Sequence, residues 1–191
     1  FDDKEGLLII PSEIGVELLL FSLGLKIKPG EGVIVPAFTF ASSAEVMPLL
    51  GAIPIFIDVR RDTFNLDPAK LFDTLKTGKD KGINVKGIMP VGLFGQPAEM
   101  DLINDFAKNN NLWVLDDAAQ SFGAEFKGNK IGQFADVTTF SFHGTKNLVT
   151  GEGGAFVTNN DSLADKARIA RDKGTDKYKF LNDPSKRGFY E

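Results

Sequence analysis

Short apolar runs alternate with longer helix-like stretches along most of the chain. Four of these runs are followed directly by Pro or Asp, and such short apolar segments are typical of strands buried in a parallel sheet. They are Val33–Val35, Ile55–Ile57, Gly87–Met89 and Leu112–Leu115. The segment Val137–Phe142 instead alternates, with Phe140 and Phe142 on one side and Thr139 and Ser141 on the other. We predict a strand at each of these five segments.

Three other stretches have helical spacing. Ile14–Leu25 is apolar nearly all round, which predicts a buried helix. A second, amphipathic helix is predicted around Leu102–Ala107 and ends at the asparagines Asn109–Asn111. A third is predicted to begin near Asp161 and Ser162. Its inward positions are Leu163, Ala164, Ala167 and Ala170.

Strands that alternate with helices at this spacing predict an α/β fold, a mostly parallel sheet in an α/β/α sandwich. In such a fold, ligands bind at the carboxyl ends of the strands. We predict one domain over residues 1–171. Residues 172–191 mix lysines with aspartates and lose the apolar periodicity, so we predict a surface loop that leaves the domain.

The amino-acid composition excludes several kinds of functional site. The 191 residues include no Cys and one His, His143, which excludes disulfides, thiolate zinc sites, cysteine nucleophiles and sites with several histidines. We therefore predict no metal site. With a net charge of -4, the chain as a whole lacks the positive charge that would attract nucleic acid or an anionic membrane. No apolar run approaches the roughly 20 residues of a membrane span, and no signal pattern opens the chain, so we predict a cytoplasmic protein.

Two adjacent carboxylates come directly after the predicted strand Leu112–Leu115. Asp116 and Asp117 stand where a ligand crevice is expected. Either carboxylate could bind a cation or a cofactor, and a strand-end Asp can equally cap a following helix. The pair alone does not decide among these interpretations.

A lysine comes shortly after the predicted strand Val137–Phe142. Lys146 precedes the flexible glycine-rich turn Gly151–Gly154, where backbone can approach a ligand. Such a lysine can be a Schiff-base nucleophile when its amine is desolvated near another cation, and it can equally be a solvent lysine in a turn. The spacing of a phosphate-binding P-loop is absent.

Pyridoxal phosphate would unite these features. It needs a lysine, a carboxylate for the pyridine nitrogen, and hydroxyls or amides for the phosphate. Lys146, Asp117 and Ser141 all stand at predicted strand ends, and the segment Pro36–Phe40 supplies an aromatic residue to cover the ring.

Four blocks of the sequence, in order and at similar spacing, resemble the sugar aminotransferases of fold type I known as the DegT/DnrJ/EryC1/StrS family. The resemblance covers most of the chain and implies the large domain of that fold. The blocks are PGEGVIVPAFTFASSAEVMPLLGAIPIFIDVRRDTFNLDP, PVGLFGQPAEMD, LDDAAQSFGAEFKGNKIGQFAD and FSFHGTKNLVTGEGGAFVTNND.

The resemblance implies a role for each matching residue. Lys146 would be the Schiff-base lysine and proton shuttle, and Asp117 would bind the pyridinium nitrogen. Gln120 would lie near the ring hydroxyl, Phe40 would stack on the ring, and Ser141 would bind the phosphate. Family members that dehydrate their substrate carry histidine at the position of Lys146, so the lysine favours amino transfer.

The resemblance also implies a reaction. L-glutamate would give its amino group to the 4-keto carbon of a dTDP-linked 6-deoxyhexose, and the product would be dTDP-4-amino-4,6-dideoxygalactose for lipopolysaccharide or other surface polysaccharides. The family further implies a homodimer.

One segment departs from the family pattern. Ser12 and Glu13 stand where the family binds the cofactor phosphate, and Glu13 replaces a threonine, which would set a negative charge beside the phosphate. The family also has an N-terminal segment and a C-terminal small domain, and we expect this chain to lack both. An alternative function is therefore a truncated, inactive relative that acts as a binding or oligomerisation module. A magnesium-dependent phosphotransferase that uses Asp116 and Asp117 is a third hypothesis.

Overall fold

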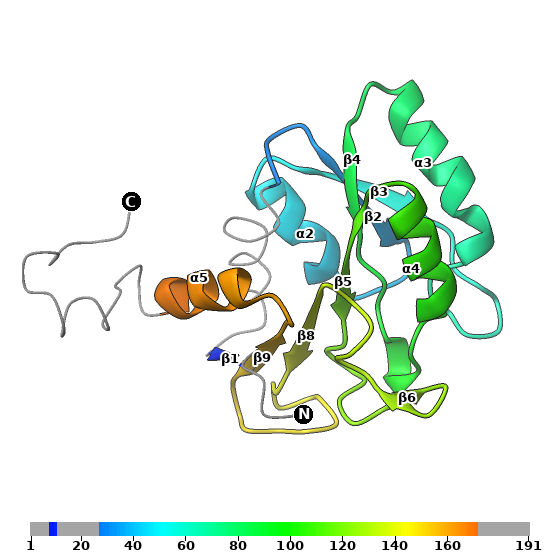
Figure 1. The fold of residues 1–191 in the computed structure, drawn as a ribbon. Helices are drawn as coiled ribbons and strands as arrows, with labels where there is room; N and C mark the ends of the chain where they lie inside the picture. Colours follow the sequence, from blue (N-terminus) through cyan, green and yellow to red (C-terminus); the bar gives the residue numbers. More distant parts are fainter. Residues whose placement is uncertain (1–7, 11–26, 172–191) are drawn as a thin grey trace, which may run out of the picture.

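The computed structural model describes residues 8–10 and 27–171. Within these residues the chain forms a seven-stranded sheet with the order β1-β9-β8-β5-β4-β2-β3 (Figure 1). The strands are β1 (Leu8–Ile10), β2 (Gly32–Pro36), β3 (Ile53–Ile57), β4 (Val85–Ile88), β5 (Trp113–Asp117), β8 (Val137–Ser141) and β9 (Gly154–Val157). The short strands β6 (Glu125–Phe126) and β7 (Asn129–Lys130) pair separately as a two-stranded antiparallel ribbon.

The strand directions confirm the mostly parallel sheet that the sequence predicts. β3, β2, β4, β5 and β8 pair in parallel, whereas β9 is antiparallel to β8 and β1 is antiparallel to β9. Gly87 in β4 allows a close approach, because a Cβ atom there would lie 2.2 Å from the ring of Trp113 in β5. A larger residue at Gly87 would therefore push these neighbouring strands apart.

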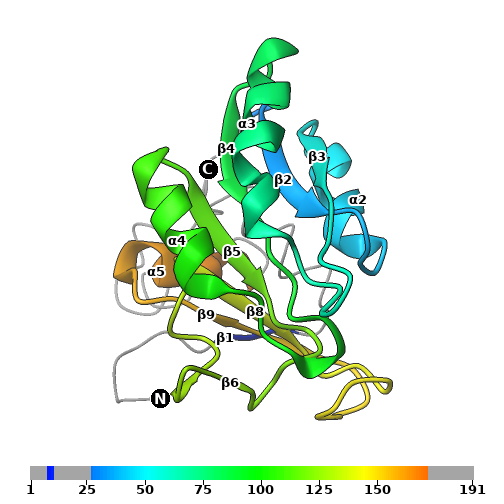
Figure 2. The ribbon, with the colours of Figure 1, turned by 90° about the vertical axis from the view of Figure 1, so that its right-hand side faces the viewer.

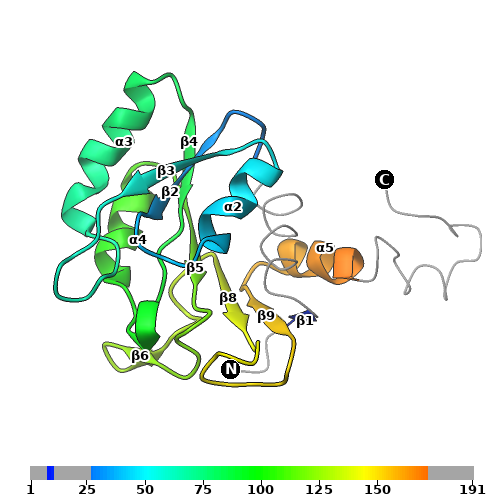
Figure 3. The same cartoon turned by 180° about the vertical axis from the view of Figure 1, so that it is seen from behind.

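In the described part of the chain, helices cover the sheet in two layers (Figures 1 and 3). The helices are α2 (Ser42–Leu49), α3 (Leu71–Asp80), α4 (Met100–Asn109) and α5 (Asp161–Arg171). One core joins α2 and α5 to one face of the sheet, and a second joins α3 and α4 to the other. The fold is thus an α/β/α sandwich, as predicted, and burial of both faces explains why the sequence of β2 is apolar without alternation.

The predicted elements largely agree with the structure. All five predicted strands form, and the two predicted helices that fall on described residues form as α4 and α5. Leu163, Ala164 and Ala167 of α5 are buried, but Ala170 is only half-buried because it lies on the last turn. The predicted helix Ile14–Leu25 lies outside the described residues. None of the helices in the described part of the chain is long and apolar enough to span a membrane.

The predictions do not include α2, α3 or the antiparallel strand β9. The α2 sequence contains Pro48 and has no clear apolar face, so its spacing gives little signal. The start of β9 falls within the predicted glycine-rich turn, although Gly154 begins a strand that is buried throughout.

The parallel strands end at one edge of the sheet. The segments that come after β2, β4, β5 and β8 leave from this edge, and the long loop between β8 and β9, drawn in yellow, projects from it (Figure 2). This is the edge where the sequence predicts a ligand site.

Candidate functional site

A cavity of about 830 Å³ opens at the carboxyl edge of the sheet. Segments that come after β2, β4, β5 and β8 all contribute to its wall, as expected for a site at this edge. Its size lies within the range of small-molecule and cofactor pockets. The lining residues are Phe40, Ser42, Phe94, Gln120, His143, Thr145, Lys146, Asn147, Glu152 and Gly153.

Lys146 and Phe40 face each other at this cavity. The Nζ atom of Lys146 lies over the Phe40 ring, 5.8 Å from its centroid. Phe40 is 64% exposed and lines the cavity. The backbone N–H of Lys146 donates to the carbonyl of His143 at 2.9 Å, which fixes the turn that carries the lysine. An amine and an exposed aromatic ring at one cavity suit a flat aromatic aldehyde.

Gln120 occupies the wall of the same cavity, three residues after the end of β5. Its Oε1 atom accepts a hydrogen bond of 2.9 Å from the backbone N–H of Phe94. Phe94 lies in the short turn Leu93–Gly95 after β4, and its backbone φ is 56°. The three predicted residues Phe40, Gln120 and Lys146 are therefore brought together at one cavity.

Asp117 does not line this cavity, but its hydrogen-bond partners Ser43 and Ala119 adjoin the lining residues Ser42 and Gln120. Asp117 is 2% exposed, and its carboxylate accepts hydrogen bonds from the Ser43 hydroxyl at 2.7 Å and from the Ala119 N–H at 3.1 Å. Thr39 and Ser43 share a further hydrogen bond of 3.1 Å. Because the single Ser43 proton goes to Asp117, Thr39 is the donor in that pair. This chain of donors stabilises the charged form of the carboxylate.

Asp116 has a different environment, although it adjoins Asp117 in the chain. Successive strand residues face opposite sides of a sheet, so Asp116 faces the side covered by α3 and α4, away from Ser43. Its Oδ2 atom is buried without a hydrogen-bond partner among the described residues. Burial, and secondarily the charge of Asp117, raises the pKa of Asp116 to about 7.

The opposed directions of the two carboxylates bear on two interpretations of the Asp pair. Asp116 and Asp117 do not converge on one cation, so the pair lacks the geometry that the phosphotransferase hypothesis needs. The cap interpretation is half right. Asp117 does cap the backbone through the Ala119 N–H, but the residues after Asp117 form a turn and not a helix.

The predicted phosphate residues are only partly placed. Ser141, at the end of β8, is fully buried and accepts a hydrogen bond of 3.4 Å from the His143 N–H. It pairs with Gly154 of β9 and does not line the cavity. Ser12 and Glu13 lie outside the described residues.

Sequence reasoning missed several residues of the site. Ser43 is not among the predicted residues, although a second hydroxyl four residues earlier, Thr39, places two small polar side chains together at a strand end. Phe94 is not among them either. The two glycines near it, Gly92 and Gly95, are an available signal for a turn at the edge of a ligand site.

The comparisons with known proteins agree with this geometry. The DegT/DnrJ/EryC1/StrS aminotransferase family matches residues 14–187. A GDP-perosamine synthase of Caulobacter vibrioides is 45% identical over 161 residues, which are 84% of this chain and 41% of that protein. A dTDP-3-amino-3,4,6-trideoxy-alpha-D-glucose transaminase of Streptomyces venezuelae is 37% identical over 163 residues, with 84% and 41% covered. The chain thus spans about two fifths of these relatives.

The solved structures give the same result. The structure of NtdA from Bacillus subtilis with bound cofactor PMP is 31% identical and has a TM-score of 0.75 to this fold. The match covers 85% of this chain and 35% of that one. The residues at the carboxyl edge fit such a cofactor, because an amine, an aromatic ring and an amide line one cavity at the strand edge where a hydrogen-bonded carboxylate, Asp117, also lies.

Proposed function

Because the chain belongs to the DegT/DnrJ/EryC1/StrS aminotransferase family, whose members depend on pyridoxal phosphate, we propose that it carries the cofactor apparatus of a nucleotide-sugar aminotransferase. One observation supports this proposal most strongly. The Lys146 amine and the Phe40 ring face each other at a cavity that Gln120 also lines, and Ser43, next to the lining residue Ser42, donates to the Asp117 carboxylate.

Pyridoxal phosphate, when bound, supplies an aldehyde that carries an amino group and a ring that accepts electrons. Lys146 would hold the cofactor and, in each of the two half-reactions, move a proton between the substrate carbon and the C4′ carbon of the cofactor. Asp117 would keep a proton on the ring nitrogen, since its charged form is already stabilised by Ser43 and Ala119. Phe40 would stack on the ring, Gln120 would bind the ring hydroxyl, and Ser141 would bind the phosphate.

We assign L-glutamate as amino donor and the 4-keto carbon of a dTDP-linked 6-deoxyhexose as acceptor. The names of the relatives support a nucleotide sugar in general, and one of them names a dTDP-linked product. The product would serve surface polysaccharide synthesis, and the enzyme would be cytoplasmic.

We also propose a homodimer. Three aromatic side chains, Phe38, Phe64 and Phe94, are each about half or more exposed and form a contiguous cluster with centroid distances of 5.6 and 6.3 Å. Phe94 also lines the cavity, so the cluster begins at the mouth of the site. Monomeric proteins rarely expose a cluster of this kind, and a second copy of the chain would cover it. Sedimentation velocity on the chain and on Phe38→Ser checks this proposal.

The amino-donor half-reaction tests the proposed function. Addition of pyridoxal phosphate should give a visible absorbance band that Lys146→Ala abolishes, and L-glutamate should then bleach it. The dTDP-linked keto sugar should restore the band, and a GDP-linked one should not.

Three other outcomes would contradict the proposal at different points. A Lys146-dependent band that ignores glutamate would favour the alternative of a cofactor-binding module without turnover. A band that bleaches and returns only with the GDP-linked sugar would overturn the dTDP assignment. A folded chain without any band would contradict cofactor binding by this chain.

A further inference from the structure

Asn65 is a buried polar residue that belongs to none of the roles above. It is 3% exposed and lies in the loop between β3 and α3. Its side chain makes two hydrogen bonds to the turn after β4. Oδ1 accepts from the Leu93 N–H at 3.2 Å, and Nδ2 donates to the Gln96 carbonyl at 2.8 Å. These two bonds settle the orientation of the amide, because an N–H requires the oxygen and a carbonyl requires the nitrogen.

The two bonds of Asn65 flank a strained residue. Phe94, between Leu93 and Gln96, has φ 56°, which is unfavourable for a bulky side chain and persists only when the surroundings impose it. The same conformation brings the Phe94 N–H to Oε1 of Gln120 at 2.9 Å. Asn65 therefore maintains the backbone shape that brings this donor to Gln120.

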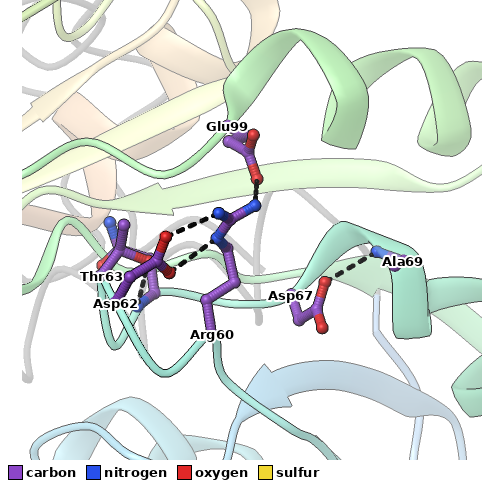
Figure 4. A network of polar contacts seen from close by, with 7 residues as sticks. Arg60, Asp62, Thr63, Asp67, Ala69 and Glu99 are labelled. Atoms are coloured by element: carbon purple, nitrogen blue, oxygen red, sulfur yellow. Dashed lines mark hydrogen bonds and ion pairs between the residues drawn. The ribbon is translucent and has the colours of Figure 1, made fainter.

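The loop that carries Asn65 is itself fixed by charged contacts (Figure 4). Arg60 donates to both carboxylate oxygens of Asp62, at 3.0 and 2.7 Å, and to Glu99 next to α4 at 3.2 Å. The Asn65 N–H donates to the Thr63 hydroxyl, and the Asn65 carbonyl accepts from the Arg60 N–H at 2.9 Å. These bonds hold the backbone of Asn65 in place, so its side-chain amide can fix the positions of the Leu93 N–H and the Gln96 carbonyl.

The consequence falls on Gln120. A glutamine amide can present either its oxygen or its NH₂ group to a ligand. Because the Phe94 N–H occupies Oε1, the NH₂ group remains for the cavity that Gln120 lines. An NH₂ group donates to an anionic oxygen and repels a donor. The contacts of Asn65 thereby determine that Gln120 donates a hydrogen bond to the ligand, so the ligand atom must be an acceptor.

We propose that Asn65 is a positioning residue of the site, which holds the Leu93–Gly95 turn so that Gln120 presents its NH₂ group to an oxygen of the ligand. The proposal rests on the proposed function only for the identity of that ligand. The contacts that lead from Asn65 through the Leu93–Gly95 turn to Gln120 are present before any cofactor binds.

Amide hydrogen exchange of the cofactor-free chain, measured by NMR, tests this chain of contacts. We expect the Phe94 amide to be protected in the wild type. Asn65→Ala should speed its exchange about tenfold or more, and Gln120→Ala should do the same from the other end without disturbing the buried loop. Asn104→Ala is the matched control, since its amide clamps the Phe134 carbonyl at 2.8 Å elsewhere in the fold. An unprotected Phe94 amide in the wild type, or one that ignores Asn65→Ala, would overturn the proposal.

Cofactor titration measures whether Asn65 acts through Gln120. Asn65→Ala should weaken pyridoxal phosphate binding about five- to tenfold in the wild-type background and less than about twofold in the Gln120→Ala background. An equal loss in both backgrounds would show a merely structural role and contradict the proposal. If the wild type binds no pyridoxal phosphate, the proposed function fails for this chain, and the exchange experiment still decides the role of Asn65.

Discussion

The end of β5 presents two aspartates to two different environments. Asp117 faces the α2 side, where the Ser43 hydroxyl and the Ala119 N–H satisfy its carboxylate. Asp116 faces the α3 and α4 side, where one of its oxygens has no partner among the described residues and where burial raises its pKa to about 7. The two aspartates are adjacent in one strand and equally buried, yet their environments differ. Hydrogen bonds stabilise the charged form of Asp117, whereas burial favours the neutral, protonated form of Asp116.

At equal burial, hydrogen-bond donors distinguish the two strand-end carboxylates. Both side chains are 2% exposed, so desolvation alone would favour the neutral form of each. Among the described residues, the Ser43 hydroxyl and the Ala119 N–H offset this cost at Asp117, whereas Oδ2 of Asp116 has no such donor. A role as a fixed negative charge beside a cofactor is therefore chemically available to Asp117 and not to its neighbour.

Loss of the Asp117 charge should have the largest effect. Asp117→Asn keeps the shape and can still accept from Ser43, but it no longer favours a proton on the ring nitrogen. We expect amino transfer to fall about a hundredfold or more, the scale of losing one preorganised electrostatic contact. Asp116→Asn is the matched control and should stay within about twofold of the wild type. Stopped-flow measurement of the glutamate half-reaction compares them, and equal losses in both variants would remove the distinction.

The second prediction concerns stability and pH. Asp116 binds its proton in the folded state up to a pKa of about 7, whereas an unfolded Asp releases it near pH 4. Between these pH values the folded state therefore binds more protons than the unfolded state. As the pH rises from about 4 through about 7, the free energy of unfolding falls, because the proton on Asp116 no longer favours the folded state. Asparagine cannot ionise, so the Asp116→Asn variant should not show this loss. Its free energy of unfolding, relative to that of the wild type, should rise on the order of 2–4 kcal/mol from pH 5 to pH 8.

Urea unfolding at the two pH values gives this relative change. The comparison between pH values cancels any constant packing cost of the asparagine. A wild type and variant that respond identically to pH would show that Asp116 has a stable charged form, and the contrast between the two faces would not hold.

The smallest expected effect comes from Ser43, the donor that distinguishes the two faces. Ser43→Ala removes a hydrogen bond to a charged group, and we expect a loss of about 1.5–3 kcal/mol in the free energy of unfolding at pH 7. The loss should shrink in the Asp117→Asn background, where the charge is gone. A double-mutant cycle by urea unfolding measures this coupling, and strict additivity would show that Ser43 does not stabilise the carboxylate.

Much of the fold is predictable from the sequence because a buried parallel sheet leaves short apolar runs that are followed by Pro or Asp. The residues Lys146, Gln120 and Phe40 are predicted from the resemblance, together with the chemistry of strand ends, and the structure places them at one cavity. Ser43 is not predictable in this way, because a serine inside a short helix resembles many surface serines until its partner 74 positions away is known. The conformation of Phe94 is equally hidden, since three separate segments impose it.

Reductive trapping tests the proposed cofactor site most directly. The chain is incubated with pyridoxal phosphate, reduced with borohydride, digested and examined by peptide mass spectrometry, with Asp117→Asn beside it. We predict one pyridoxyl group per chain on the peptide that contains Lys146, and weaker labelling of the same lysine in the variant. A label that is spread over exposed lysines such as Lys127 and Lys166, with Lys146 unmodified, would contradict a cofactor site at the carboxyl edge of this sheet.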